Sequence, residues 1–519
     1  MKNYKYIALF LLSLGVMSCE ENTDFDPIEA PVMPVVQLNT NNLDFSKYIS
    51  LGASFTAGYT DGALFTKAQE NSFPNILASK FSTDFNQPLM KDNIGGFVFG
   101  GNATAEPRLY FDGAGPVRLD ALPTTGLVDR AEGSSFNNYG VPGAKSFHLV
   151  APGYGNPAGI LAGSANPYYA RMASSAEATV LGDVMAQSPS FFTLSEVGGN
   201  DVLGYATSGG SGVDQSPSAT NPTGNLDPAT YGSNDITNPL VFDQVFRNMV
   251  GVMTAGDAKG VIATVPDITL LPYFTTVPYN PIPMDTATAT AVNGAYAAYN
   301  GGIQQAFGAL VAGNLISQDA ANAEITKRTI NFTAGQNPVV IIDESLTDLG
   351  AINPAFNALQ QLRQSTSEDL LVLPGSSFIG TLADPSNPSS VNGVGVPLAD
   401  QWVVTDSELA SISAATSAYN ATITDVASTN DQVALVDLNA ILREASGGIV
   451  FDNYTITTSL VTGGLVSLDG VHLTGRGYAL MANRILGAID DKFGSNFRTA
   501  TNGLAKADDY PTNYNPALR

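Results

Sequence analysis

Histidine and cysteine are scarce in this chain. Its 519 residues include only two histidines, His148 and His472, and one cysteine, Cys19. Protein zinc sites are built chiefly from these two residue types, and no D-x-D-x-D-G loop of the kind that binds calcium occurs. We therefore expect no metal site and no cofactor, with a calcium site built from oxygen ligands alone as the alternative. A single cysteine cannot form an internal disulfide.

Positive charge is also in short supply. The chain has 23 Lys and Arg residues against 47 Asp and Glu residues, which gives a formal net charge of -24. Because a phosphate backbone would be repelled, this balance argues against nucleic acid as a partner. Hydrophobic residues make up 44% and charged residues 13% of the sequence, as is typical of a globular protein and not of a disordered one.

The only candidate for a membrane-directed segment is the N-terminus. Lys2 and Lys5 precede an apolar stretch over 7–16, which is too short to span a bilayer and therefore predicts a signal peptide over 1–18. Cys19 follows small residues at the predicted cleavage point. This arrangement resembles a bacterial lipoprotein signal, which implies a lipid on Cys19 that anchors the protein to a membrane. A plain signal peptide with an incidental cysteine is the alternative.

The residues after Cys19 carry a second targeting pattern. Glu20-Glu21-Asn22 resembles the acidic export signal of surface-exposed bacterial lipoproteins. The resemblance implies a location in the cell envelope, at the outer membrane and exposed on the surface. Residues 19–44 are polar, acidic and Pro-containing, so we expect a flexible tether there.

The body of the chain alternates predicted strands with predicted helices. Apolar runs predict strands at 48–51, 190–195, 260–267 and 433–438, and helical periodicity predicts helices at 241–255, 289–310, 408–426 and 475–490. This alternation is typical of an α/β fold with a parallel sheet and helices on both faces. We expect one domain over 45–492, with loop-rich insertions at 59–135, 205–238 and 312–400 and a tail at 493–519.

Ser54 follows the first predicted strand directly. It lies in Gly52-Ala53-Ser54-Phe55-Thr56-Ala57-Gly58, whose small residues suit a tight turn from strand to helix. Such a turn can present a hydroxyl at the carboxyl end of a parallel sheet, where open α/β folds hold their ligands. The alternative is an ordinary loop serine.

A serine nucleophile needs a base, and the base needs a third group to orient its ring. His472 is the natural base, and Asp469 lies close enough in sequence to orient it. The oxyanion of an acyl-transfer reaction also needs hydrogen-bond donors. We expect these from the Ser54 N–H, the Gly143 N–H and the Asn200 side-chain amide. His148 is expected to be a structural or surface residue.

Four sequence blocks carry a resemblance to a known family. They are GASFTAG at 52–58, GVPGA at 140–144, GGNDVL at 198–203 and DGVHLTGRGY at 469–478. In this order they resemble the SGNH (GDSL-type) hydrolase superfamily, and the resemblance covers residues 48–490. It implies a three-layer α/β/α sandwich with a flavodoxin-like parallel sheet. It also implies Ser54 as nucleophile, His472 as base and Asp469 as orienting acid, with Gly143 and Asn200 as oxyanion donors.

The chain departs from this family at one position of the serine turn. The acid that the family carries before the serine is Ala53 here. This residue is outside the triad, so the departure bears on the support of the turn and not on the chemistry itself.

The expected function is carboxylic ester hydrolysis at the cell envelope through an acyl-Ser54 intermediate. The substrate could be a small-molecule, lipid or glycan ester. A non-catalytic surface lipoprotein that binds glycan or lipid on the same scaffold is the alternative.

Overall fold

The structure, a computed structural model, describes residues 35–519. The predicted signal peptide over 1–18, the lipidation site Cys19 and the tether up to residue 34 lie outside the described residues. The last part of the tether contacts the C-terminal region, since Asn39 N donates to Asn496 Oδ1 at 2.7 Å and Asn41 Nδ2 donates to the Phe493 carbonyl at 2.7 Å.

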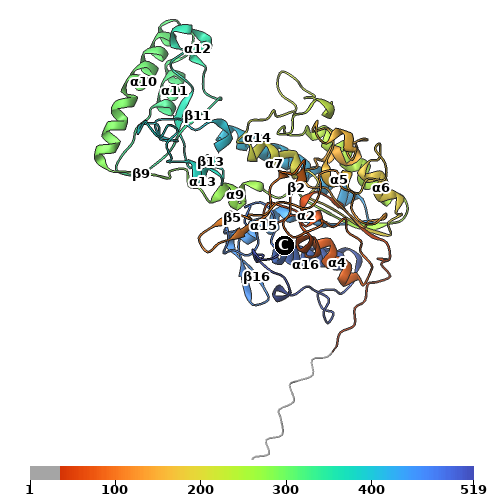
Figure 1. The fold of residues 1–519 in the computed structure, drawn as a ribbon. Coiled ribbons are helices and arrows are strands. Elements are labelled where there is room, and N and C mark those ends of the chain that lie inside the picture. Colours follow the sequence, from red (N-terminus) through yellow and green to blue (C-terminus); the bar gives the residue numbers. More distant parts are fainter. Residues whose placement is uncertain (1–34) are drawn as a thin grey trace, which may run out of the picture. The chain divides into compact units, whose positions relative to one another are not determined.

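The fold is built on a five-stranded parallel sheet with the strand order β15-β8-β7-β1-β6. Figure 1 shows the chain coloured along its sequence. The strands of the sheet are β1 (Tyr48–Gly52), β6 (Asn138–Gly140), β7 (Phe191–Ser195), β8 (Lys259–Ala263) and β15 (Val433–Val436). Every residue of β1, β6 and β7 is buried. Burial on both faces explains why these strands read as nearly continuous apolar runs.

Helices flank this sheet in two groups. In one group α4 (Phe73–Phe81) packs against α16 (Gly475–Phe493), and in the other α8 (Pro239–Thr254) packs against α14 (Asp406–Thr429). Both α14 and α16 contact β8 and β15. The arrangement is α/β with a helix-flanked parallel sheet and is compatible with three α/β/α layers. Three further helices are α6 (Val180–Ala186), α7 (Asn200–Thr207) and α15 (Leu438–Gly447).

A second hydrophobic cluster forms within residues 277–403. It gathers around α10 (Thr286–Ala312) and two small antiparallel pairs, β9 (Ile282–Met284) with β10 (Gly335–Asn337) and β11 (Val340–Ile342) with β12 (Leu362–Gln364). A further cluster packs α10 against α11 (Gln318–Arg328). The predicted helix over 289–310 therefore belongs with the region after it and not with the central sheet.

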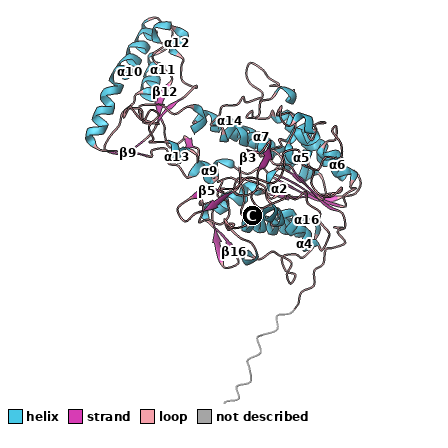
Figure 2. Cartoon of the chain, viewed as in Figure 1, coloured by secondary structure: helices cyan, strands magenta, loops and turns pink. Residues whose placement is uncertain are grey.

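The remaining elements are short and connect the larger ones (Figure 2). The antiparallel pairs are β2 (Phe97–Phe99) with β3 (Asn102–Ala105), β4 (Leu109–Phe111) with β5 (Pro116–Arg118), β13 (Leu370–Leu371) with β14 (Val403–Val404), and β16 (Ile449–Phe451) with β17 (Tyr454–Ile456). The short helices are α2 (Ser54–Ala57), α3 (Thr66–Glu70), α5 (Pro167–Ala170), α9 (Pro272–Thr275), α12 (Leu349–Ile352) and α13 (Gly375–Phe378). No helix between residues 35 and 519 has both the length and the hydrophobicity needed to cross a bilayer.

The predicted strands and helices of the body are present, and one core strand was missed. The stretch just before and into the block GVPGA, for which no strand was predicted, contributes β6 at the edge of the sheet. Three residues are too few to show a period in the sequence. Thr474 caps α16, because its hydroxyl accepts the Gly477 N–H at 2.9 Å.

A substitution of Gly140, at the end of β6, can test how closely the sheet approaches α2. A Cβ there would meet the Ala57 backbone nitrogen at 2.2 Å. Gly140→Ala should therefore lower the free energy of unfolding by roughly 1–3 kcal/mol, as overpacking does, and a fall in Tm would report it. Gly251→Ala is the control, because nothing lies within 4 Å of its added Cβ. A glycine in a helix interior costs about 0.5–1 kcal/mol relative to alanine, so this control should gain stability. Equal Tm values for Gly140→Ala and Gly251→Ala would contradict the close approach of β6 to α2.

Candidate active site

Three strands of the sheet end level with one another. Gly52 of β1 is in register with Gly140 of β6 and with Ser195 of β7. Ser54, Gly143 and Asn200 follow these strand ends closely in sequence. Strand β6 lies on one side of β1 and β7 on the other, so this edge is a topological switch point, where open α/β sheets hold their ligands.

Asp469 and His472 form a hydrogen-bonded pair on one tight loop. Asp469 Oδ2 lies 2.9 Å from His472 Nδ1, and Asp469 Oδ1 accepts the backbone N–H groups of Val471 and His472, each at 2.8 Å. The side chain of His472 is 15% exposed and that of Asp469 is 12% exposed. The ring is therefore oriented by a nearly buried acid while part of it stays accessible.

The environment of Asp469 favours its ionised form. Burial alone would raise its pKa, but the His472 ring and the two backbone N–H donors outweigh burial and hold the pKa of Asp469 below its ordinary value. A carboxylate at this position can accept from His472 Nδ1, which leaves Nε2 as the nitrogen free to take a proton.

A segment shortly after Ser54 holds the Asp469 loop in place. The Gly62 N–H donates to Asp469 Oδ2 at 2.7 Å, so the acid is fixed from two sides. Two more bonds join the same two segments, Asp61 N to Ser467 Oγ at 3.0 Å and Leu468 N to Asp61 Oδ1 at 3.1 Å. Tyr478 Oη of the following helix α16 donates to the Tyr59 carbonyl at 2.6 Å. Residues 59–62, placed by sequence in a surface insertion, thus form part of the site.

Ser54 begins α2, a few residues before the segment 59–62 that binds the Asp469 loop. It is buried, and the rings of its neighbours Phe55 and Tyr59 lie 5.9 Å and 4.5 Å from the His472 ring, measured between centroids. Within residues 35–519 the Ser54 Oγ makes no hydrogen bond, so its bond to His472 is not formed here. Catalytic hydrogen bonds often tighten only when substrate binds, so the serine remains a candidate nucleophile.

The three predicted oxyanion donors differ in what they already bind. In the described chain neither the Ser54 N–H nor the Gly143 N–H donates to a protein acceptor. Asn200 Nδ2 donates one hydrogen to the Ala144 carbonyl at 2.9 Å, and its second hydrogen remains available. Gly143 has φ +81°, a left-handed conformation that favours glycine.

An apolar cavity opens beside Ser54. It encloses about 840 Å³ of unfilled space, its mouth included, and Glu196, Gly199 and Asn200 line it together with the serine. The rest of its wall is almost entirely aliphatic and includes Leu203, Ile268, Leu271, Leu442, Leu473 and Met481. An aliphatic wall with a few polar groups is typical of sites for small apolar ligands.

Glu196 is a buried acid that the sequence analysis did not single out. Its Oε1 accepts the N–H groups of Ala53 at 2.6 Å and Thr56 at 2.9 Å, and its Oε2 accepts the Thr56 hydroxyl at 3.2 Å. Burial raises the pKa of Glu196 to about 7, although these donors act in the opposite direction. An acid directly after a buried strand was the one available signal in the sequence.

Asp61 is a second buried acid that was missed. Only 1% of its surface is exposed, and in the part of the chain that the structure describes its Oδ2 has no hydrogen-bond partner. Burial and the nearby charge of Asp469 raise the pKa of Asp61 to about 7, although the Leu468 N–H lowers it. An Asp-Gly pair in sequence indicates only a turn, which is why this residue gave no signal.

His148 has a structural role, as expected. Its Nδ1 accepts the Lys145 N–H at 3.1 Å, and its ring stacks on that of Tyr154 with 4.3 Å between centroids. Burial lowers the pKa of His148 to about 4, which keeps the ring neutral. Asp201 holds the same region, since its carboxylate accepts the Ser146 N–H at 2.9 Å and hydroxyl at 2.7 Å.

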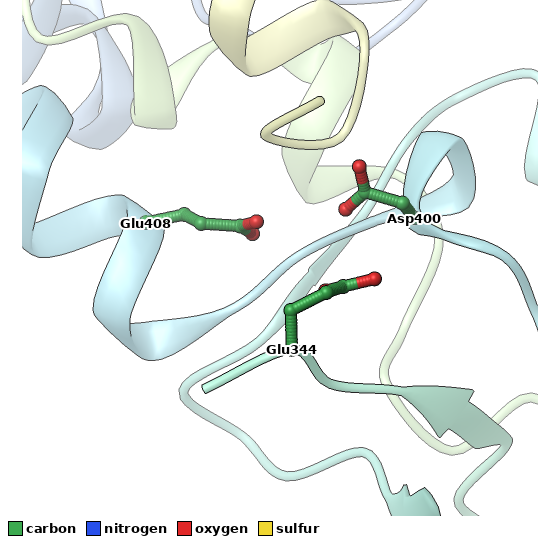
Figure 3. A group of neighbouring side chains, drawn as sticks. All are labelled: Glu344, Asp400 and Glu408. Atoms are coloured by element: carbon green, nitrogen blue, oxygen red, sulfur yellow. The ribbon is translucent and has the colours of Figure 1, made fainter. Parts of the chain in front are cut away.

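Three acids form a separate group, with carboxylates facing a common space (Figure 3). Glu344, Asp400 and Glu408 each offer an oxygen within 4.8 Å of the others. Burial and the neighbouring acids raise the pKa of Asp400 to about 6 and that of Glu408 to about 7, the latter against the hydrogen bonds from Thr405. The group lines no part of the cavity at Ser54, and a cluster of acids alone does not establish a metal site.

Comparison with known proteins finds no match for the chain among protein-family models, curated proteins or solved structures. The geometry of residues 35–519 and the sequence motifs are therefore the basis for assigning a function.

The raised pKa of Asp61 predicts a pH dependence of stability. Folding retains a proton on Asp61 between its ordinary pKa of 3.8 and about 7, so the wild type loses stability as pH rises through this range. Asp61→Asn cannot titrate. Its Tm relative to wild type should therefore be higher at pH 8 than at pH 5.

Ser467→Ala is the matched control for this measurement. It removes the acceptor of the Asp61 N–H without changing any charge, so its Tm difference from wild type should be the same at both pH values. If the Asp61→Asn difference is equally independent of pH, Asp61 does not titrate as described.

Proposed function

We propose that the chain is a carboxylic ester hydrolase of the SGNH (GDSL-type) kind that uses Ser54, His472 and Asp469 as its catalytic triad. The observation that carries the proposal is the Asp469–His472 pair, with its 2.9 Å bond, held against the segment that follows Ser54. The parallel sheet and its switch point beside Ser54 are in keeping with this family.

The reaction follows from the roles of these groups. The Ser54 oxygen attacks the ester carbonyl while His472 Nε2 takes the hydroxyl proton, and Asp469 holds the ring in the tautomer this requires. The N–H groups of Ser54 and Gly143 and the free Asn200 hydrogen stabilise the oxyanion. The alcohol leaves with the proton from His472, and a water molecule, activated by the same ring, then hydrolyses the acyl-serine.

The cavity favours esters with an aliphatic acyl chain of several carbons. Its wall is aliphatic apart from a few polar residues, one of which, Glu196, binds the backbone next to Ser54. Each methylene of a longer acyl chain that is buried against this wall contributes about 0.8 kcal/mol, and an acetyl group lacks these methylenes. Among the substrate classes open from the sequence, this supports lipid or fatty-acyl esters over acetylated glycans. We place the enzyme at the cell envelope, anchored through Cys19.

A second candidate is a surface lipoprotein that binds an apolar ligand in this cavity without turnover. The same aliphatic wall would serve such a protein, but ligand binding alone does not require the nearly buried Asp469 to orient the ring of His472. The two candidates differ in whether Ser54 reacts.

The first test is covalent labelling of Ser54. A fluorophosphonate should react with the wild type by forming a bond from Ser54 Oγ to phosphorus and releasing fluoride. Ser54→Ala should not label, and His472→Ala should lower kcat for a nitrophenyl ester by roughly 10³-fold or more while keeping the fold. An unlabelled wild type, or equal labelling of Ser54→Ala, would exclude the esterase and favour the binding protein.

A second test measures the acyl preference. With nitrophenyl esters of increasing chain length, kcat/KM should rise by up to about 4-fold per methylene until the cavity is full, which corresponds to about 0.8 kcal/mol each. Leu203→Trp narrows the cavity wall at a half-buried position and should shift the preference to short chains. Leu240→Trp is the control, because Leu240 is 50% exposed on α8. A flat profile in the wild type would contradict an acyl role for the cavity.

A further inference from the structure

We propose that Glu196 is the positioning residue of the Ser54 nucleophile, supplying from strand β7 the support that Ala53 cannot give within the turn. This inference rests on the proposed esterase function and concerns the same site. It assigns a role to a side chain at the end of a different strand, 142 positions after the serine in sequence.

The contacts of Glu196 lie on both sides of the nucleophile. A single oxygen, Oε1, accepts the N–H of the residue before Ser54, Ala53 at 2.6 Å, and the N–H of Thr56 two residues after it at 2.9 Å. The other oxygen accepts the Thr56 hydroxyl at 3.2 Å. Glu196 also lines the cavity next to Ser54. Its carboxylate therefore fixes the backbone that determines where the Ser54 hydroxyl points.

No side chain of the serine turn itself accepts the N–H groups of Ala53 and Thr56. Helix α2 is a single turn of four residues, and its N-cap Ala53 has a methyl group in place of a hydrogen-bonding side chain. The first N–H groups of a helix need acceptors from outside the helix. In the described chain the Glu196 carboxylate is the acceptor for two of the N–H groups in this turn.

The backbone of Glu196 is also unusual. Its φ of +48° lies in the left-handed region that non-glycine residues rarely adopt. A strained conformation of this kind costs about 1–3 kcal/mol and persists where the surrounding structure requires it. Here it brings a buried acid, 6% exposed, to the nucleophile turn. Both the strain and the burial of an acid oppose folding, so the arrangement indicates a role beyond stability.

The proposed role of Glu196 requires a side chain long enough to reach the serine turn and an oxygen that accepts hydrogen bonds. Substitutions can change these two properties separately. Glu196→Gln keeps an oxygen that can accept both N–H groups, and its amide can donate to the Thr56 hydroxyl. Glu196→Asp keeps the charge but is one methylene shorter, so it cannot reach both N–H groups. If Glu196 positions the serine turn, Glu196→Gln should keep the activity and Glu196→Asp should lose it. If the negative charge of Glu196 is what matters, the opposite result is expected.

The experiment compares the rate of fluorophosphonate reaction, and kcat and KM for a nitrophenyl ester, across the wild type and Glu196→Gln, Glu196→Asp and Glu196→Ala. Gln should stay within about 3-fold of the wild-type kcat. Asp and Ala should lower kcat and the phosphonylation rate by about 10- to 100-fold, the scale of an ångström-sized misplacement, with KM little changed.

Asp285→Ala is the matched control. Asp285 caps α10 by accepting the Thr288 N–H at 2.7 Å, so its loss removes a helix-capping carboxylate far from Ser54 in sequence. The control should lose stability and keep the wild-type rates.

The outcomes separate the two proposals. If the wild type does not react with the fluorophosphonate, or if Ser54→Ala reacts as fast as the wild type, the esterase proposal itself is contradicted. A reactive wild type with unchanged rates in Glu196→Ala contradicts only the role of Glu196. If Glu196→Ala does not fold, Glu196→Asp takes its place in the test. A wild-type kcat in Glu196→Asp would also contradict the proposal that Glu196 positions Ser54.

Discussion

The parallel pairing of β1 with both β6 and β7 is the constraint on which the site depends. Because Gly52 is level with Gly140 on one side and Ser195 on the other, the loops after three strands meet at one edge of the sheet. A slip in this register would move Ser54 away from Asn200 and would also take Glu196 from the serine turn. The close approach of Gly140 to Ala57 requires a residue without a side chain.

Two buried acids hold the two halves of the candidate triad. Glu196 binds the backbone around Ser54, and Asp61 binds the loop that carries Asp469. Burial raises the pKa of both acids to about 7, while the pKa of Asp469 is held low. The site thus contains three carboxyl groups with different environments, and only the one paired with His472 is clearly kept ionised.

Local sequence was enough to select Ser54, Asp469 and His472 as candidates, because each lies in a short motif next to a recognisable strand or helix. The hydrogen bond between Asp469 and His472 also depends only on local sequence, since the two residues lie on one loop. Glu196 and Asp61 could not be predicted, because their roles depend on contacts with residues more than 100 positions away. Helix α10 shows the same limit: its periodicity predicts a helix but not the cluster it packs in.

The most direct test of the account is a crystal structure of the protein after reaction with a long-chain alkyl fluorophosphonate. The account predicts phosphorus bonded to Ser54 Oγ, a phosphoryl oxygen within hydrogen-bond distance of the Gly143 N–H and the Asn200 amide, and the alkyl chain in the cavity lined by Leu442 and Met481. An adduct on another residue, or a chain that lies outside this cavity, would contradict it.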